Sequence, residues 1–287
     1  MNLSANLNKN FISFIEKFPP IPTNLQKLIK LLNDENSNFN KLEKEIAYNQ
    51  SLSVNLLRLA NSAYYGYNQS TASIAEAVKR VGINTVKKIA HIELIKTKLN
   101  KDLNSYKINA RELWKHSLST AIIAEYLSSH KYPSFKSKSF ITGLVIDIGK
   151  ICIDNYLSSQ NIILFDEKNS INENYILNLE RKIIATDHAE IGGLILKNWN
   201  FPEEIVLTIK YHHNPEDAPA NTLKQSAIIH IADLLSLAAG YGYKIDKKDV
   251  KLSPKALKIL NLKFDEVFEL IEYNLINLEE LIQRWLV

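Results

Sequence analysis

Residues 144–150 read Leu-Val-Ile-Asp-Ile-Gly-Lys, and this stretch decides how the rest of the chain is interpreted. Asp147 has apolar residues on both sides, so the pattern predicts a carboxylate that is buried on folding. A buried carboxylate is stable only where a cation, a metal ion or several hydrogen-bond donors replace the lost hydration. The chain must therefore supply partners for Asp147, and its histidines are the first place to look.

Four histidines and a second aspartate lie in similarly apolar settings. Asp233 has Ile229 four residues before it and Leu237 four residues after it, so the three side chains share one helix face. Imidazole and carboxylate groups together are typical ligands of Fe, Mn, Zn or Ni. We therefore predict one shared site, holding a single Fe, Mn, Zn or Ni ion or retained in vestigial form. Its members are His116, Asp147, His188, His212, His213 and Asp233.

Two other histidines, His91 and His230, are left out of this set. A single histidine on an apolar helix face is more often a core residue than a ligand. We expect the rings of both residues to be hydrogen-bonded to backbone carbonyl groups.

The composition is that of an ordinary globular protein, with 46% hydrophobic and 23% charged residues among 287. The 35 basic and 31 acidic side chains leave a net charge of +4, which is too small a surplus to indicate nucleic-acid binding. Cys152 is the only cysteine, which excludes an internal disulfide and favours a reducing, cytoplasmic setting. No run reaches the ~20 apolar residues of a membrane span. Residues 1–14 lack a signal-peptide core, so no membrane partner is expected.

Helical periodicity dominates the chain, and no run shows the alternation typical of strands. Only 8 Gly and 8 Pro argue against a turn-dense β protein, so the expected fold class is all-α. One helix is expected to run unbroken from Phe140 to Tyr156. The last helix, from Asp265 to Leu286, has a continuous apolar stripe. We expect that stripe to pack on its own domain or, failing that, on a second copy of the chain.

The Asp147 segment resembles the central motif of the HD superfamily, metal-dependent phosphohydrolases named for an adjacent His-Asp pair. Ile146 stands where that histidine would be, and isoleucine has no lone pair to donate to a metal. The N-terminal half resembles the HDOD family, a bacterial branch related to the HD phosphohydrolases. The motifs that carry this second resemblance are Phe18-Pro19-Pro20-Ile21-Pro22, Leu56 to Gly66 with its Asn-Ser-Ala-Tyr-Tyr-Gly end, Ile74 to Val86, Trp114 to Ser117, Gly143 to Lys150, His188 to Gly192 and Tyr211 to His213.

The resemblance covers about residues 18 to 240 and implies an all-α, HD-domain-like bundle. It would have an N-terminal helical subdomain and a C-terminal amphipathic helix. We accordingly expect a lead-in helix at 1–17, an HDOD domain at 18–240 and a helical extension at 241–287. Within the domain we expect an N-terminal helical half at 18–100 and an HD-like half at 110–240.

The resemblance also implies a role in bacterial signal transduction or regulation, and two functions remain open. The first is a non-catalytic regulatory protein that acts through a protein partner of a signalling pathway or a small ligand. A homodimer through the C-terminal helix is one such arrangement. The second is a phosphohydrolase, a phosphodiesterase or nucleotide phosphatase, that retains one metal on Asp147, His188 and His212 or His213. We favour the first because Ile146 removes a ligand. The chain also lacks the Gly-Tyr-Pro motif of the branch that hydrolyses cyclic di-GMP.

A second group of residues, near the end of one N-terminal helix, could face a ligand or partner: Arg58, Asn61, Tyr64 and Tyr65. The simpler interpretation is a helix end. There Asn61 and Ser62 would satisfy backbone groups, and Gly66 would supply a positive φ. We favour this simpler interpretation.

Overall fold

The computed structural model describes residues 9–34, 38–99, 101–164, 173–242, 252–267 and 278–283. Regular structure in these ranges is helical, apart from one isolated antiparallel bridge between Leu103 and Ile108. The prediction of an all-α fold is therefore confirmed. None of the described helices is both long enough and apolar enough to cross a membrane.

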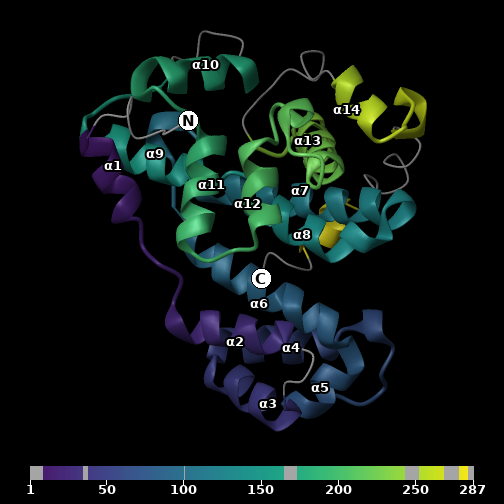
Figure 1. The fold of residues 1–287 in the computed structure, drawn as a ribbon. Coiled ribbons are helices and arrows are strands. Elements are labelled where there is room, and N and C mark those ends of the chain that lie inside the picture. Colours follow the sequence, from purple (N-terminus) through teal and green to yellow (C-terminus); the bar gives the residue numbers. More distant parts are fainter. Residues whose placement is uncertain are drawn as a thin grey trace. The chain divides into compact units, whose positions relative to one another are not determined.

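The chain divides into two compact units, which are described separately here (Figure 1). Unit 1 comprises Met1–Pro20 and Leu99–Ile282, and unit 2 comprises Ile21–Lys98 and Gln283–Val287. The domain boundaries expected from the sequence are a finer division than this and stay a prediction.

Unit 2 is a small helical bundle. Its first helix buries Leu25, Leu28 and Leu32. Ser73 caps another helix by accepting a hydrogen bond from the Glu76 backbone N–H at 3.3 Å. Such a cap satisfies one of the backbone donors that a helix start leaves unpaired. The helices are α2 (Thr23–Asn33), α3 (Phe39–Tyr48), α4 (Gln50–Ala60), α5 (Ile74–Val81) and all but the last residue of α6 (Ile83–Leu99).

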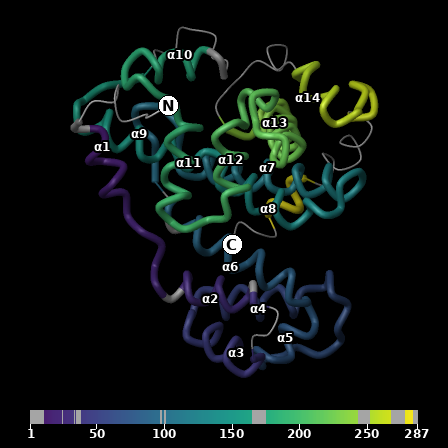
Figure 2. The backbone as a smooth tube through the Cα atoms, viewed as in Figure 1, coloured from purple at the N-terminus to yellow at the C-terminus, as the bar shows by residue number. Residues whose placement is uncertain are grey.

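Unit 1 is larger and contains the predicted site. Its helices are α1 (Lys9–Glu16), α7 (Ala110–Lys131), α8 (Lys136–Leu144), α9 (Ile148–Ser159), α10 (Glu173–Ile184), α11 (His188–Asn198), α12 (Glu203–Lys210), α13 (Leu223–Ala238) and α14 (Pro254–Ile259). Helix α7 packs against α8 and α13, and α11 packs against α9 and α12. Figure 2 traces the backbone through both groups of helices.

The prediction of one helix from Phe140 to Tyr156 is wrong, because the chain turns at 145–147 between α8 and α9. Close backbone contacts fix the two helices separately. A Cβ on Gly143 would lie 2.6 Å from the Ala121 Cα of α7, and a Cβ on Gly149 would lie 2.0 Å from the His188 carbonyl oxygen at the start of α11. The turn between these contacts takes Asp147 out of regular helix.

Much of the predicted final helix, Asp265 to Leu286, lies outside the described residues. The described parts of it, 265–267 and 278–283, are helical. Of the predicted lead-in helix at 1–17, the described part is α1, Lys9–Glu16.

Candidate functional site

The six predicted site residues come together in unit 1. His116 lies on α7, Asp147 in the turn before α9, and His188 is the first residue of α11. The other three are His212 and His213, just after α12, and Asp233 on α13. Asp147 lies centrally, with one carboxylate oxygen 3.5 Å from His116 Nε2 and the other 3.6 Å from His188 Nε2. The residues form two groups on the two sides of this carboxylate.

The first group, the His116 cluster, consists of His116, Asp233 and Ser236. His116 Nε2 lies 2.9 Å from Asp233 Oδ1. Its Nδ1 lies 3.1 Å from Ser236 Oγ and 3.3 Å from the Tyr241 carbonyl oxygen. Burial acts to lower the pKa of His116, but the hydrogen bond and charge of Asp233, with a smaller effect of Asp147, raise it above its ordinary value. The two carboxylates therefore favour the protonated form of this ring.

Ile146 and Lys150 complete the surroundings of Asp147 on this side. The isoleucine, which stands in place of the expected histidine, directly precedes Asp147 in the turn and is 0% exposed. Lys150 is also 0% exposed, and its Nζ lies 2.8 Å from Asp147 Oδ1. Burial would raise the pKa of Asp147, but Lys150, followed by His116 and His188, lowers it below its ordinary value. Asp147 is thus an ion-paired carboxylate.

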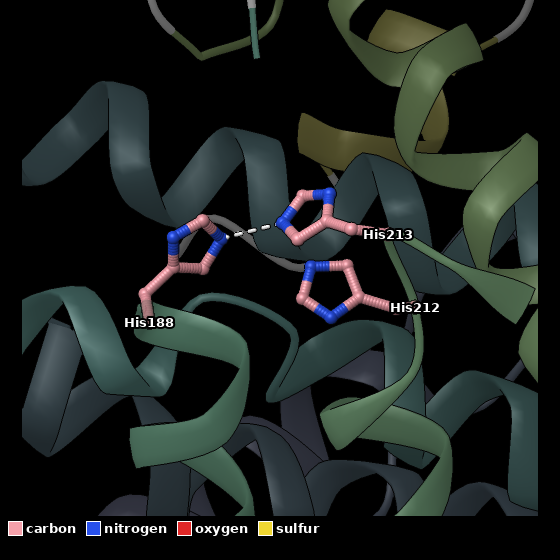
Figure 3. Close-up of side chains that lie close together, drawn as sticks. All are labelled: His188, His212 and His213. Atoms are coloured by element: carbon pink, nitrogen blue, oxygen red, sulfur yellow. Dashed lines mark hydrogen bonds between the residues drawn. The ribbon is translucent and has the colours of Figure 1, made fainter. Parts of the chain in front are cut away.

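The second group, the three-histidine cluster, consists of His188, His212 and His213 (Figure 3). One ring nitrogen from each residue can be chosen so that all lie within 4.8 Å of one another. His188 and His212 are fully buried, and His213 is partly buried. The Nε2 atoms of His188 and His213 are 2.8 Å apart, within hydrogen-bond distance.

Outer partners fix the tautomers of two of these rings. His188 Nδ1 donates to Glu180 at 2.8 Å, and His212 Nδ1 donates to the Ile209 carbonyl at 2.6 Å. A neutral imidazole that donates through Nδ1 keeps its lone pair on Nε2. His188 Nε2 then accepts from His213 Nε2–H, whereas His212 Nε2 has no hydrogen-bond partner in the described ranges.

The electrostatics of the three-histidine cluster favour the neutral forms of His212 and His213. Burial, followed by the neighbouring His188, lowers the pKa of His212 to about 4. Burial and the neighbouring His212 hold the pKa of His213 well below its ordinary value. Neutral imidazoles are the form that binds metal ions.

The three-histidine cluster fits a divalent transition-metal ion. Three imidazole nitrogens with an open further position are a known zinc arrangement, and carboxylate or carbonyl partners on the opposite ring nitrogens are usual for metal-bound histidines. Metal–nitrogen bonds of about 2.0–2.1 Å place such nitrogens roughly 3.3 Å apart, so His188 and His213 would have to separate slightly. The unpartnered, buried His212 Nε2 supports this fit. The His116 cluster fits an ion less well, because the pairs that Asp233 forms with His116 and Lys150 forms with Asp147 Oδ1 would have to break, although Asp147 Oδ2 is buried without a hydrogen-bond partner among the described residues.

Two residues that matter at the site were missed from the sequence. Lys150 lies three residues after Asp147, a spacing that places side chains on one helix face. Glu180 lies between Ile176 and Ile184, at four-residue intervals on the buried face of α10. An acidic residue within an apolar stripe was the signal that could have identified it.

The remaining predicted residues do not join this site. Arg58, Asn61, Tyr64 and Tyr65 belong to unit 2. The Asn61 side chain exchanges two hydrogen bonds with the Thr71 backbone, and Gly66 has a φ of 66°, as the helix-end interpretation predicts. The predictions for the two core histidines are also confirmed. His91 Nδ1 lies 2.7 Å from the Lys87 carbonyl oxygen and His230 Nδ1 lies 2.8 Å from that of His212.

Solved structures share this fold at low sequence identity. An HDOD domain protein of unknown function from Geobacter sulfurreducens is similar with a TM-score of 0.78 and 21% identity, with 97% of each chain covered. A candidate signal transduction protein from Marinobacter aquaeolei has a TM-score of 0.71 and 19% identity, covering 99% of this chain and 68% of that one. A candidate phosphohydrolase from Shewanella amazonensis has a TM-score of 0.68 and 20% identity, covering 97% and 98%.

A sequence relative extends the comparison. An uncharacterized protein from Treponema pallidum is 27% identical over 207 residues, which are 71% of this chain but 39% of that protein. This chain thus matches well under half of that relative's length. The family model of the HDOD domain matches residues 18–215, which is more than half of the chain. The His116 cluster, the three-histidine cluster and the all-α fold around them therefore belong to a member of the HDOD domain family.

Proposed function

We propose that this chain is a non-catalytic regulatory HDOD protein, which acts by binding a protein partner or a small ligand. The observation that carries the proposal is the state of Asp147. It is paired with Lys150 at 2.8 Å, beside a fully buried Ile146. A site for two metal ions would need this carboxylate as a free ligand between them.

The His116 cluster supports the same conclusion. His116 and Asp233 are 2.9 Å apart and both are at most 3% exposed at the side chain, so each already has a partner of opposite charge. A metal ion could bind there only after these ion pairs were broken. The cost of separating buried charges is several kcal/mol, which the ion would have to compensate without an imidazole at position 146.

The partner class follows from the family and not from a contact in the structure. A structurally similar protein from Marinobacter aquaeolei is described as a candidate signal transduction protein. We propose a bacterial, cytoplasmic setting and a partner protein of a signalling pathway. A homodimer through the C-terminal helix is the alternative arrangement of the same proposal.

Phosphohydrolase assays test this proposal directly. The full chain, purified without a metal-affinity tag, would be supplied in turn with Fe²⁺, Mn²⁺, Zn²⁺ and Ni²⁺ and assayed with phosphodiester and nucleotide substrates. The expected result is no turnover above the metal-only background. Turnover that is lost in Asp147→Ala would overturn the proposal.

The three-histidine cluster favours a second candidate function, a phosphohydrolase with one metal ion. His188, His212 and His213 would hold the ion, and Asp147 would join them if Lys150 released it. When bound, such an ion polarises a phosphoryl group and lowers the pKa of a bound water. Elemental analysis of the wild type should then show about one ion per chain, and His188→Ala should lose it. A preparation that takes up no ion on incubation would reject this candidate.

A further inference from the structure

The Leu103–Ile108 turn lies near the start of Leu99–Ile282, the second stretch of unit 1. Leu103 and Ile108 exchange backbone hydrogen bonds of 2.8 and 3.1 Å, and Lys107 has a φ of 52°. Tyr106 lies inside this turn and is 1% exposed. A tyrosine buried to this extent needs a partner for its hydroxyl group.

That partner is Glu180, the residue that orients His188. The Tyr106 hydroxyl donates to Glu180 Oε1 at 2.7 Å. The backbone N–H of His188 donates to Glu180 Oε2 at 2.8 Å, and His188 Nδ1 lies 2.9 and 2.8 Å from the two oxygens. The Glu180 side chain is 0% exposed, so these donors replace its hydration.

This arrangement couples two distant parts of unit 1. Both oxygens of Glu180 are held, one by Tyr106 and the other by the first residue of α11, so the carboxylate cannot rotate without losing a bond to one of them. The His188 ring is held in turn through Nδ1, which leaves Nε2 directed at His213. His188 therefore opposes a displacement of Tyr106, and Tyr106 opposes a displacement of His188.

Metal binding would act on this same series of bonds. An ion bound at Nε2 makes the Nδ1–H of an imidazole a stronger donor, which tightens its bond to an acceptor carboxylate. A His188 ring fixed by the ion would also fix the orientation of the Glu180 carboxylate, which accepts from both its Nδ1 and its backbone N–H. The Tyr106 hydroxyl would then donate to a more rigidly held acceptor, which restricts the turn around it.

We propose that Glu180 and Tyr106 are positioning residues of the three-histidine cluster, and that a divalent transition-metal ion bound there stabilises the Leu103–Ile108 turn through them. The inference rests on the proposed regulatory function. It supplies a route by which occupancy of the cluster reaches a turn elsewhere in unit 1. The route requires no hydrolysis.

Metal affinity gives the first test. Co²⁺ would be titrated into the full chain and followed by its visible absorption bands, which report coordination and not activity. Glu180→Gln, which loses the charge but keeps the shape, should weaken Co²⁺ binding about 10- to 100-fold. Tyr106→Phe should weaken it roughly three- to tenfold, as expected for one lost hydrogen bond.

A matched control removes a tyrosine hydroxyl elsewhere in unit 1. The Tyr132 hydroxyl donates to the Leu260 carbonyl at 2.9 Å and contacts no member of the cluster. Tyr132→Phe should lose comparable stability and keep the wild-type Co²⁺ affinity. This comparison separates positioning from general destabilisation.

Hydrogen–deuterium exchange of the turn gives the second test. In the wild type and in Tyr132→Phe, saturating Co²⁺ should slow amide exchange across residues 103–108. In Tyr106→Phe, Co²⁺ should still bind at a higher concentration but no longer slow exchange there. Because this variant removes one oxygen atom, it remains informative if Glu180→Gln fails to fold.

Three results would overturn the inference: equal Co²⁺ protection of the turn in Tyr106→Phe and the wild type, Co²⁺ binding to the wild type without any change in the turn, and no Co²⁺ binding at all. The proposed function fails separately. Phosphohydrolase turnover of the same preparations would overturn the non-catalytic role and leave the measured coupling intact.

Discussion

The His116 cluster and the three-histidine cluster lie on opposite sides of Asp147, and their ligand atoms are in opposite states. On one side, His116, whose pKa is raised, pairs with Asp233, and Lys150 pairs with Asp147. On the other side, the pKa values of His212 and His213 are lowered, and His212 Nε2 is buried without a hydrogen-bond partner among the described residues. The comparison teaches that the two clusters differ in how readily they could bind a metal ion. In the first, buried pairs would have to break, whereas the second keeps a ring nitrogen that is free within the described ranges and the outer partners of His188 and His212.

The largest effect is expected from removing the cation on Asp147. Lys150→Met should lower the free energy of unfolding by about 3–5 kcal/mol, because a buried carboxylate would lose its ion pair. The measurement is chemical denaturation at pH 7. The double variant with Asp147→Asn should recover part of the loss, since no charge is then left unpaired. A Lys150→Met protein as stable as the wild type would show that the pair is not what satisfies Asp147.

A slightly smaller loss of stability is expected from a substitution at Gly149, where α9 meets the start of α11. Gly149→Ala would put a Cβ 2.0 Å from the His188 carbonyl oxygen, so α9 and α11 must move apart. We expect a loss of about 3 kcal/mol in unfolding free energy, measured by chemical denaturation. Gly193→Ala is the matched control, because its Cβ would have no neighbour closer than 3.4 Å. It should be close to neutral, and equal effects of the two substitutions would contradict the close-contact explanation.

Restoring the missing histidine sharpens the comparison further. Ile146→His places a polar ring in an apolar space, so we expect unfolding free energy to fall by about 1–3 kcal/mol. The number of bound metal ions, measured by elemental analysis, should not increase, because Lys150 and Asp233 still occupy the ligands. Ile146→Val controls for lost volume alone. A second ion bound by Ile146→His would show that the His116 cluster is only one ligand short.

The smallest effect is a difference in pH dependence between the clusters. Below pH 6.5 the unfolded chain protonates His212, whereas the folded chain does so only near its pKa of about 4, so stability falls as the pH falls across that interval. His116, with a raised pKa, acts in the opposite sense, because its stabilisation is present below 6.5 and is lost as the pH rises through the raised pKa.

Unfolding free energies measured between pH 4 and 8 would separate the contributions of His212 and His116. One histidine contributes a slope of at most about 1.4 kcal/mol per pH unit. In His212→Gln, the unfolding free energy should depend less on pH at acid pH. In His116→Gln, it should depend less on pH at neutral to alkaline pH. Identical profiles for both variants would mean that the clusters are not electrostatically distinct.

The sequence predicted the all-α fold and brought together His116, Asp147, His188, His212, His213 and Asp233, because each lies in an apolar helical context that requires burial. It did not predict the turn at 145–147. Local periodicity continues through that turn, and only the contacts of Gly143 and Gly149 with other helices require it. It also missed Lys150, since a lysine is normally exposed, and Glu180, whose partner Tyr106 is 74 positions away in the chain. Pairings over such separations depend on tertiary structure.

The short turn between α8 and α9 has a consequence for how the family can diverge. The glycines on its two sides bring both helices into close backbone contact with α7 and α11, and these contacts do not involve the side chain at position 146. The residues that determine the chemistry of the site are thus different from the glycines that set these helix contacts. A lineage can exchange reactivity for signalling, or the reverse, without redesigning its scaffold.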